Sequence, residues 1–218
     1  CQMQHMAPDA LAEWKADVVR SALATRGVEV EKELAMAISP PRSRRRATFA
    51  ARRTKKGAMA GFYGRQSDVI TEIPECQLLH PDLMPGLELA RALAEVGGSR
   101  KGTLRVSVTL AEPGLDVEVR EGKPLDGPLR VTLAQLAGQF GLVRLTWGDE
   151  TVLTMRPPRQ SFGGQSVVPP PGAFLQATKH GEEALLADVK EIVAGARHVA
   201  DLFAGCGTFA LPVAEQAR

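Results

Sequence analysis

The chain has 218 residues, of which 44% are hydrophobic and 24% charged, and its net charge is +2 at pH 7. This composition is typical of a globular protein with one large or two small domains. No apolar run approaches about 18 residues, which excludes a transmembrane helix, and 3 cysteines are too few for a disulfide framework. The sequence therefore predicts a cytoplasmic protein that has no membrane partner.

The first two thirds of the chain alternate between helical and strand-like hydrophobic patterns. The elements expected in chain order are a helix at 9–26, strands at 44–53, 58–63 and 68–73, a helix at 83–96, a hairpin of strands at 104–110 and 115–119, a helix at 129–140, and strands at 143–147 and 152–155. Short strands mixed with separate helices are typical of an α+β domain.

A segment rich in proline and glycine follows at 156–172, and we expect it to be a loop that joins two domains. Beyond it, the pattern predicts a helix at 181–193, an apolar strand at 199–203 and a helix that starts near Thr208. The order helix, strand, helix begins a doubly wound parallel sheet, and the sequence reaches Arg218 one helix later.

The sequence therefore predicts an α/β fold in two parts. An α+β central domain is expected over residues 1–165, and the start of a Rossmann-like domain is expected over residues 166–218. We expect the chain to be a monomer.

A glycine turn joins the expected apolar strand to the last expected helix. Gly205 and Gly207 let a ligand approach the backbone closely, and the N–H groups at the start of a helix favour negative charge. The turn fits either NAD or S-adenosylmethionine. Asp201 favours S-adenosylmethionine, because its carboxylate suits the methionyl ammonium group. The alternative is a tight turn that binds nothing.

A second motif, Pro170-Pro171-Gly172-Ala173-Phe174-Leu175-Gln176-Ala177, lies at the expected domain junction. Phe174 and Gln176 are two residues apart and share a face of an extended backbone. A ring that stacks on a base, beside an amide that pairs with a base edge, makes a reasonable nucleobase pocket. Taken alone, the motif fits a domain linker with one core phenylalanine better.

A basic stripe precedes this junction by more than a hundred residues. From Leu34 to Gln66 the chain has no Asp or Glu, but it has many Lys and Arg residues. Arg44, Arg46 and Arg52 share one face of the expected strand, where clustered guanidinium groups suit phosphate contacts. The stripe predicts RNA as a partner, with a solvated surface as the alternative. On the opposite face, Phe49 is the expected core contact.

The cysteines carry little information by themselves. Cys1 and Cys76 are too few to hold an iron–sulfur cluster or a structural zinc, which need about four ligands. Cys206 lies inside the glycine turn, where a small side chain that lines the cofactor loop is the favoured interpretation over a nucleophile.

Together, the motifs resemble the bacterial RNA uracil-5-methyltransferases that carry an iron–sulfur cluster. The resemblance covers the whole chain and keeps the family order of four motifs. These are the end of a cysteine signature at Cys1-Gln2-Met3-Gln4-His5-Met6, the segment from Asp68 through Cys76 to Pro81, the substrate loop at Pro171–Gln176, and the cofactor motif at Asp201–Phe209.

The resemblance implies two cofactors, S-adenosylmethionine and a 4Fe–4S cluster. Cys1 and Cys76 are implied to be the third and fourth cluster ligands, with the first two expected just upstream of residue 1. The cluster favours ribosomal RNA as the substrate over transfer RNA. The domain over residues 166–218 is implied to be the start of a class I methyltransferase domain.

The resemblance also implies roles for the other motif residues. Phe174 stacks near the target uracil, and Gln176 contacts both the base and the cofactor. The other residues implied to line the S-adenosylmethionine site are Asp201, Phe203, Gly205, Gly207 and Thr208. Many family members have Asn in place of Thr208.

In the family mechanism, a cysteine thiolate adds to carbon 6 of the uracil, carbon 5 attacks the methyl group, and a glutamate removes the carbon 5 proton. Both groups belong to motifs that follow the cofactor loop, so we expect them beyond Arg218 and expect this chain to be part of a longer enzyme. Two alternatives stay open: a non-catalytic RNA-binding module and an NAD-dependent oxidoreductase.

Overall fold

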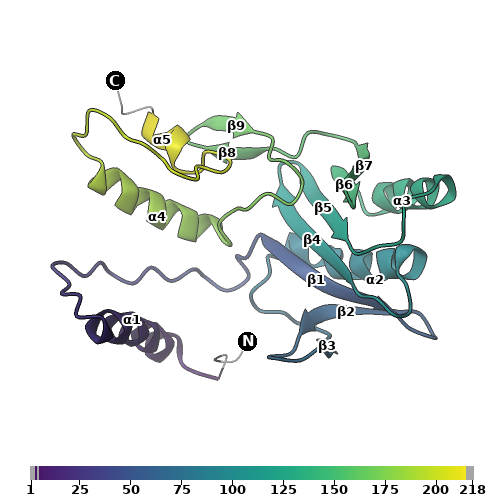
Figure 1. Ribbon diagram of the computed structural model, residues 1–218, viewed down its shortest axis with the longest axis horizontal. Helices are drawn as coiled ribbons and strands as arrows, with labels where there is room; N and C mark the ends of the chain where they lie inside the picture. The colour runs from purple at the N-terminus through teal and green to yellow at the C-terminus, as the bar shows by residue number, and fades with distance from the viewer. Residues whose placement is uncertain (1–2, 4, 215–218) are drawn as a thin grey trace. The chain divides into compact units, whose positions relative to one another are not determined.

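A computed structural model of the chain describes residue 3 and residues 5–214 (Figure 1). Its contacts divide into two compact units, Cys1–Ser39 and Pro40–Arg218. Across the described part of the chain, every helix is too short or too polar to cross a lipid bilayer. The domain boundary expected between residues 165 and 166 stays a prediction.

The first unit contains one helix, α1 (Pro8–Thr25), close to the expected bounds of 9–26. Proline suits its first turn, because the N–H group that proline lacks has no intrahelical partner there. None of the helical residues is buried. The exposed guanidinium of Arg20 binds the carboxylates of Glu33, Glu13 and Asp17, which together raise the pKa of Arg20.

The second unit is built on a seven-stranded sheet with the order β3-β2-β1-β4-β5-β6-β7. Neighbouring strands are antiparallel, except for the parallel pair β5 and β6. The strands are β1 (Arg46–Arg53), β2 (Ala58–Tyr63), β3 (Ile70–Thr71), β4 (Leu104–Ala111), β5 (Gly114–Arg120), β6 (Arg144–Trp147) and β7 (Glu150–Thr154). The seven strands expected from the sequence are therefore confirmed, although β3 is shorter than expected.

Helices cover one face of this sheet and enclose the core with it. α2 (Pro85–Gly97) contacts β1, β2 and β4, whereas α3 (Gly127–Gln139) contacts α2, β6 and β7, and a 3-10 turn, η1 (Pro81–Leu83), leads into α2. Phe49 is completely buried and stacks on Phe62 with 5.5 Å between ring centroids. Burying a side chain of this size contributes about 1.5–3 kcal/mol, and the expected core role of Phe49 is confirmed.

The other face of the sheet is polar, because side chains alternate between the two faces of a strand. Arg46 and Thr48 on β1 lie opposite Thr109 and Ser107 on β4, and the two hydroxyls of Thr48 and Ser107 are 3.1 Å apart. The segment at the expected domain junction covers part of this polar face, with Gly172 against Glu118 and Phe174 against Arg46.

The segment 156–172 was expected to be a loop, but it contains a small hairpin of β8 (Gln160–Phe162) and β9 (Gln165–Val167). Gly163 and Gly164 both have positive φ, as a two-residue hairpin turn requires. The hairpin is bound to the end of β4: Glu112 and Arg159 exchange two backbone hydrogen bonds of 2.9 Å. The Gly-Gly pair was the sequence signal for this turn.

After the hairpin come α4 (Lys179–Ile192) and α5 (Ala210–Ala214), and α5 begins two residues later than expected. The expected strand at 199–203 is wrong: these residues form turns and irregular backbone. Leu202 is 80% exposed, and Phe203 is fully exposed with a φ of +66°. A parallel strand gains its hydrogen bonds and its burial from neighbouring strands, and the seven-stranded sheet does not extend to this segment.

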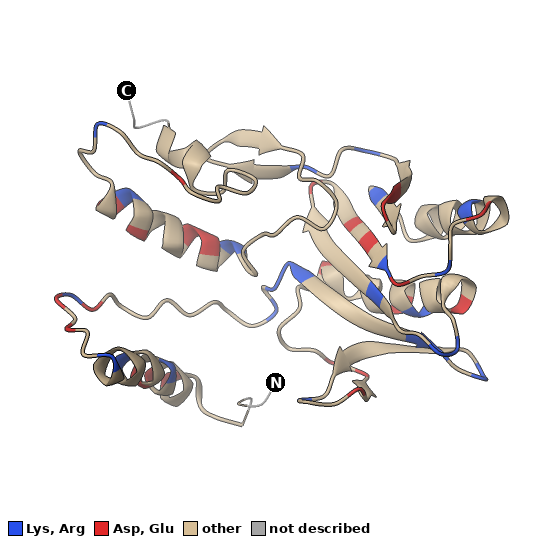
Figure 2. Cartoon of the chain, viewed as in Figure 1, with Lys and Arg blue, Asp and Glu red and all other residues tan. Residues whose placement is uncertain are grey.

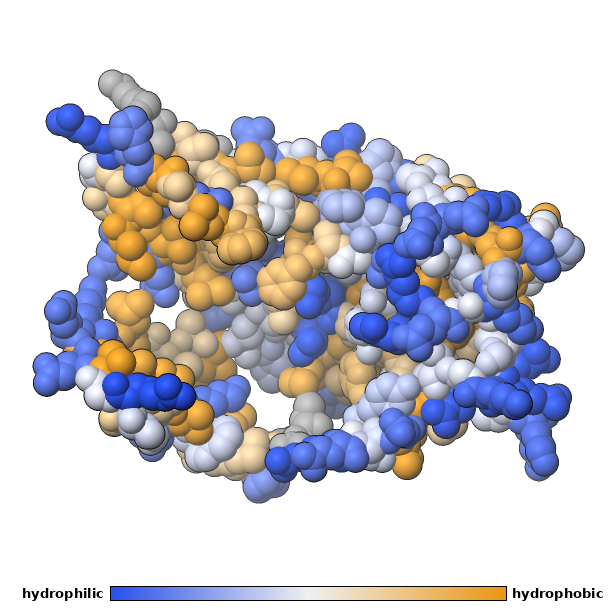
Figure 3. Space-filling model, in the orientation of Figure 1, coloured by the Kyte–Doolittle hydropathy of each residue, from blue (hydrophilic) through white to orange (hydrophobic). Residues whose placement is uncertain are grey.

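Figure 3 shows the consequence for the surface: hydrophobic residues, in orange, gather over α4 and the segment that follows it. Ile192, Leu202 and Phe203 are the most exposed large hydrophobic residues of this part. Apolar patches of this kind mark surfaces that pack against another partner.

Two glycines offer a matched test of the core. A Cβ on Gly97 would lie 2.3 Å from the buried Trp147 ring, whereas a Cβ on Gly138 meets nothing within 4 Å. We expect Gly97→Ala to lower the free energy of unfolding by about 1–3 kcal/mol through overpacking. Gly138→Ala, inside α3, should raise it by about 0.5–1 kcal/mol. Urea unfolding of both variants measures the difference, and equal stabilities would contradict this packing.

Candidate functional site

The candidate site lies where the segment 169–178 crosses the polar face of the sheet. Its first turn has Ala173 donating to the Pro170 carbonyl at 3.1 Å, with Pro171 and Gly172 at the centre. Gly172 has a φ of +68°, so this is the proline–glycine arrangement of a type II turn. A Cβ on Gly172 would lie 2.4 Å from a carboxylate oxygen of Glu118 on β5. The turn therefore rests directly on the sheet.

Arg144 holds the beginning of this segment. Its guanidinium binds both carboxylate oxygens of Asp116 at 2.8 and 2.7 Å, and it also donates to the Pro169 carbonyl at 2.8 Å. Both charged side chains are nearly buried, at 8% and 12% exposed. A bidentate pair of this geometry is directional, so Arg144 fixes the place where the segment leaves the β6 side of the sheet.

Arg45 holds the other end of the segment. Its backbone N–H donates to the Ala177 carbonyl at 2.9 Å, and its Nε donates to the Gln176 carbonyl at 3.1 Å. Its Nη2 binds the Glu182 carboxylate of α4 at 2.5 Å, and this carboxylate also accepts from Lys179. Arg45 and Glu182 are both buried. One arginine thus ties β1, the Gln176 backbone and α4 together.

Phe174 lies between these two anchors and remains 66% exposed. The guanidinium carbon of Arg46 sits 4.5 Å from the centroid of the Phe174 ring, within cation–π range. Burial and the neighbouring charges of Arg44 and Arg45 lower the pKa of Arg46. The structure therefore brings two of the predicted substrate residues, Arg46 and Phe174, into direct contact.

The other two arginines of the predicted stripe take different positions. Arg44 donates from Nε to the Arg46 carbonyl at 3.0 Å, which keeps it beside Arg46. Arg52 donates to the Thr103 hydroxyl at 3.0 Å. It lies six residues further along β1, which is about 20 Å from Arg46 in a strand. The stripe therefore runs away from Phe174 along the sheet.

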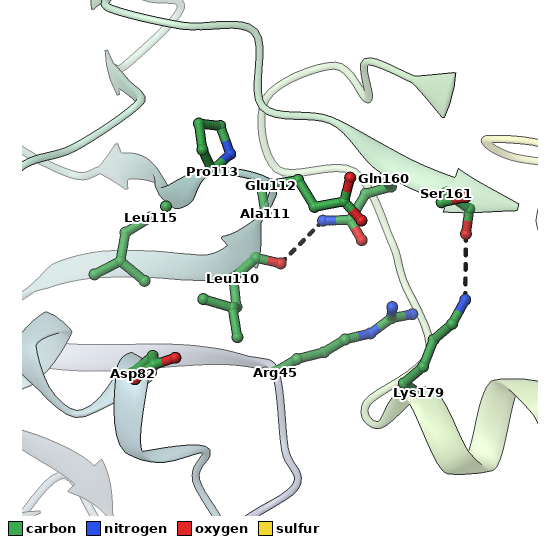
Figure 4. Close-up of a pocket in the computed structure, with 11 residues that line it drawn as sticks. Arg45, Asp82, Leu110, Ala111, Glu112, Pro113, Leu115, Gln160, Ser161 and Lys179 are labelled. Carbon is green, nitrogen blue, oxygen red and sulfur yellow. Dashed lines mark hydrogen bonds between the residues drawn. The ribbon is translucent and has the colours of Figure 1, made fainter. Parts of the chain in front are cut away.

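An open cavity of about 650 Å³ adjoins the Arg45 anchor (Figure 4). Figure 4 shows Arg45 and Lys179 entering it from one side and Gln160 and Glu112 from the other. Gln160 donates to the Leu110 carbonyl, and Lys179 donates to the Ser161 carbonyl at 3.2 Å. The sequence did not point to Gln160, Lys179 and Glu182, because a single polar residue in a short strand or in the first turn of a helix belongs to no recognisable sequence motif.

The two glycines of the glycine turn meet different constraints: Gly207 lacks room for a side chain, and Gly205 has a backbone conformation that favours glycine. A Cβ on Gly207 would lie 2.8 Å from Cγ of Leu211, so α5 leaves no room for a side chain there. Gly205 has a φ of +59° and open space around it. Asp201 is exposed, whereas Thr208 is half-buried. An exposed carboxylate four residues before an open glycine suits the ammonium group of S-adenosylmethionine. Burial raises the pKa of the Cys206 thiol, which disfavours its thiolate.

The structure describes only one of the two cysteines expected to bind the iron–sulfur cluster. Cys1 lies outside the described residues, and Cys76 is half-buried and packs against the core. Within residues 3 and 5–214, no group of three or more His, Cys, Asp or Glu side chains is arranged to hold a metal ion. The described part of the chain thus does not form a cluster site by itself, and the 4Fe–4S cluster stays a prediction.

Comparisons with known proteins agree with the resemblance in part. The chain is 37% identical over 218 residues to a protein of Mesorhizobium japonicum and 38% identical over 216 residues to one of Brucella suis, both named as uncharacterized RNA methyltransferases. It is 28% identical over 225 residues to a protein of Photorhabdus laumondii named as a 23S rRNA (uracil(1939)-C(5))-methyltransferase. These alignments cover 98–100% of the chain. No protein-family model matches it.

The chain spans about half the length of these curated relatives, 51–52% of each. Among solved structures, it is similar to Pyrococcus abyssi tRNA (uracil-54, C5)-methyltransferase in complex with S-adenosyl-L-homocysteine. That match has a TM-score of 0.68 at 20% identity and covers 99% of this chain and 55% of the other. The α/β fold class is therefore confirmed, and the relatives are RNA methyltransferases by name.

The buried anchor predicts a large loss of stability when one partner is removed. We expect Arg45→Met to lower the free energy of unfolding by about 3–5 kcal/mol, because it breaks a buried ion pair and leaves the Glu182 charge with Lys179 alone. The matched control is Arg130→Met, which removes an exposed ion pair with Glu150 and should cost less than about 1 kcal/mol. Urea unfolding measures both, and similar losses would contradict the role assigned to Arg45.

Proposed function

We propose that this chain works as part of an S-adenosylmethionine-dependent enzyme that methylates carbon 5 of a uridine in RNA. The observation that carries the proposal is the contact of Arg46 with the exposed ring of Phe174, next to the fixed Gln176 backbone. An aromatic ring with one cationic neighbour and one open side suits a base that has left its stack. Similarity over nearly the whole chain, which matches about half of each relative, to proteins named as RNA methyltransferases supports the same conclusion.

In this proposal, the target uracil stacks on the side of the Phe174 ring that Arg46 does not cover. The Gln176 amide pairs with the base edge, because the hydrogen bond from Arg45 to the Gln176 carbonyl fixes where that side chain starts. Arg44, Arg46 and Arg52 bind backbone phosphates, whose charge suits bidentate guanidinium groups. These contacts orient the base and leave the covalent steps to other groups of the enzyme.

S-adenosylmethionine supplies the methyl group when it is bound. The residues we propose to hold it are Gln176, Asp201, Phe203, Gly205, Gly207 and Thr208. The Asp201 carboxylate takes the ammonium group of the cofactor, and the open space at Gly205 lets the cofactor approach the backbone. The exposed Phe203 ring would offer the cofactor an apolar surface.

We propose ribosomal RNA as the substrate, with transfer RNA as the alternative. The relative from Photorhabdus laumondii is named for 23S rRNA, and the structural neighbour is named for tRNA. A 4Fe–4S cluster held by Cys76 together with Cys1 and further ligands belongs to the ribosomal hypothesis. A brown, iron-containing protein after purification without oxygen supports this part, whereas an iron-free protein with full activity contradicts it.

The experiment that tests the proposal is methyl transfer by the full-length natural protein. Labelled S-adenosylmethionine is offered with unmodified ribosomal RNA and, separately, with a transfer RNA transcript, and the nucleosides are analysed. We expect labelled 5-methyluridine from the ribosomal RNA. Label in the transfer RNA instead selects the alternative substrate. If RNA binds but no label is incorporated, the non-catalytic RNA-binding module is the better hypothesis, and competition by NAD favours the oxidoreductase.

The Phe174 ring gives a sharper test within the same assay. Stacking of one base on an aromatic ring contributes about 1–3 kcal/mol, so we expect Phe174→Ala to lower kcat/KM about 5- to 150-fold. Phe174→Trp should keep most of the activity, because it preserves a stacking surface. Val168→Ala is the matched control, since it shortens another exposed apolar side chain directly before the same segment. Equal effects of Phe174→Ala and Val168→Ala would contradict a stacking role.

A further inference from the structure

Five cations gather at the end of the sheet that is far from Phe174. They come from the turn between β1 and β2 and from the loop between α2 and β4, and they are Arg53, Lys55, Lys56, Arg100 and Lys101, here called the tip patch. Figure 2 shows these two segments in blue, close to each other at the lower right. Four of the five side chains belong to exposed residues, and Arg53 is half-buried.

Backbone contacts bring the two segments of the tip patch together. Ala51 at the end of β1 pairs with Leu104 at the start of β4, directly before the turn and after the loop. The hydrogen bond from Arg52 to Thr103 adds a side-chain link between the same two segments. The Thr54 N–H donates to the Gly57 carbonyl at 2.7 Å and closes the turn. The sheet thus fixes the cations as a group.

The tip patch differs in its ion pairing from several other charged positions of this unit. Arg91 pairs with Glu72 and Glu88, Arg120 with Glu118 and Asp149, and Arg130 with Glu150. Among the described residues, none of the five tip cations forms an ion pair or a hydrogen bond with a carboxylate. Glu95 on α2, whose oxygen faces Gly57, is the nearby acid. A patch of this kind attracts a polyanion.

The position of the tip patch relates it to the proposed RNA site. Arg46, which contacts Phe174, and Arg53 lie at the two ends of β1, about 23 Å apart, and their odd spacing of seven residues places the two side chains on opposite faces of the sheet. The polar face that carries Arg46 also offers Thr48, Ser107 and the exposed Arg105. All five tip residues are cations, so they offer charge without a ring on which a base could stack. Such groups bind phosphates and do not read bases.

We propose that the tip patch binds the phosphate backbone of the substrate RNA, several nucleotides from the base that stacks on Phe174. This inference rests on the proposed function and adds a second, remote contact with the same RNA. The contact sets affinity and the position of the RNA along the sheet. It takes no part in the methyl transfer, because it lies about 23 Å from Arg46.

The test compares two variants of the full-length protein that lose the same charge. Lys55→Gln with Lys101→Gln removes one cation from each segment of the tip patch, whereas Arg91→Gln with Arg130→Gln removes two paired cations. The dissociation constant for unmodified ribosomal RNA is measured at several salt concentrations, together with kcat at saturating RNA. Each lost phosphate contact lowers the salt slope by about 0.7–0.9.

For the tip variant we expect a salt slope lower by about 1.4–1.8, RNA binding about tenfold weaker near physiological salt, and kcat within about twofold of the natural protein. The control variant should keep the natural slope. Unchanged RNA binding by the tip variant overturns the proposal, as does a fall in kcat without a change in affinity. Loss of binding to anionic vesicles with intact RNA binding assigns the patch to a lipid surface and also overturns it.

The measurement separates this proposal from the proposed function. If the natural protein transfers no methyl group to any RNA, the proposed function fails, but the salt slopes still decide whether the tip patch binds phosphates. If methylation occurs and the slopes of the two variants agree, the remote contact fails and the enzyme assignment stands.

Discussion

The arrangement of the candidate site depends on one buried arginine. Arg45 precedes the first strand of the sheet by one residue, and it binds both the Gln176 carbonyl and the Glu182 carboxylate. A buried cation requires a partner, because leaving it uncompensated costs several kcal/mol. The segment that carries Phe174 and Gln176 therefore cannot leave the sheet without exposing or orphaning this charge. The site is held in place by this electrostatic requirement together with the burial of Leu175, which lies between Phe174 and Gln176.

The sheet itself could be predicted because its strands carry strong alternation. Phe49 between Thr48 and Ala50, and Val106 and Val108 on β4, mark one face clearly, and the Glu112-Pro113-Gly114 turn marks the hairpin between β4 and β5. The hairpin of β8 and β9 was not predicted, because three-residue strands are too short to show an alternation of apolar and polar residues. Its Gly163-Gly164 turn lay within a segment where proline and glycine indicated a loop. The strand expected at 199–203 did not form, because an apolar run becomes a buried strand only where neighbouring strands pair with it.

Only part of the candidate site could be proposed from the sequence, and its arrangement could not. Spacing placed Phe174 and Gln176 on one face of an extended backbone and the arginines in a stripe, whereas Gln160, Lys179 and Glu182 were missed. The contact between Arg46 and Phe174 joins residues that are 128 positions apart, and no local pattern carries such information. The same is true of Arg45 and Glu182, separated by 137 positions. Buried charge pairs are specified by tertiary structure, so a single sequence cannot reveal which arginine of a basic run is internal.

The two faces of β1 have a consequence for how this protein can change over generations. Phe49 and Ala51 point into the core, whereas Arg46 and Thr48 point to the polar face. Adjacent positions are therefore constrained by different parts of the structure, the core and the polar surface. Under the proposed function, substitutions at the exposed outward position Thr48 would change contacts with RNA and leave the core intact, whereas changes among apolar residues at inward positions would leave those contacts intact. A single eight-residue strand thereby separates two kinds of selection, and descendants can acquire new specificities on an unchanged scaffold.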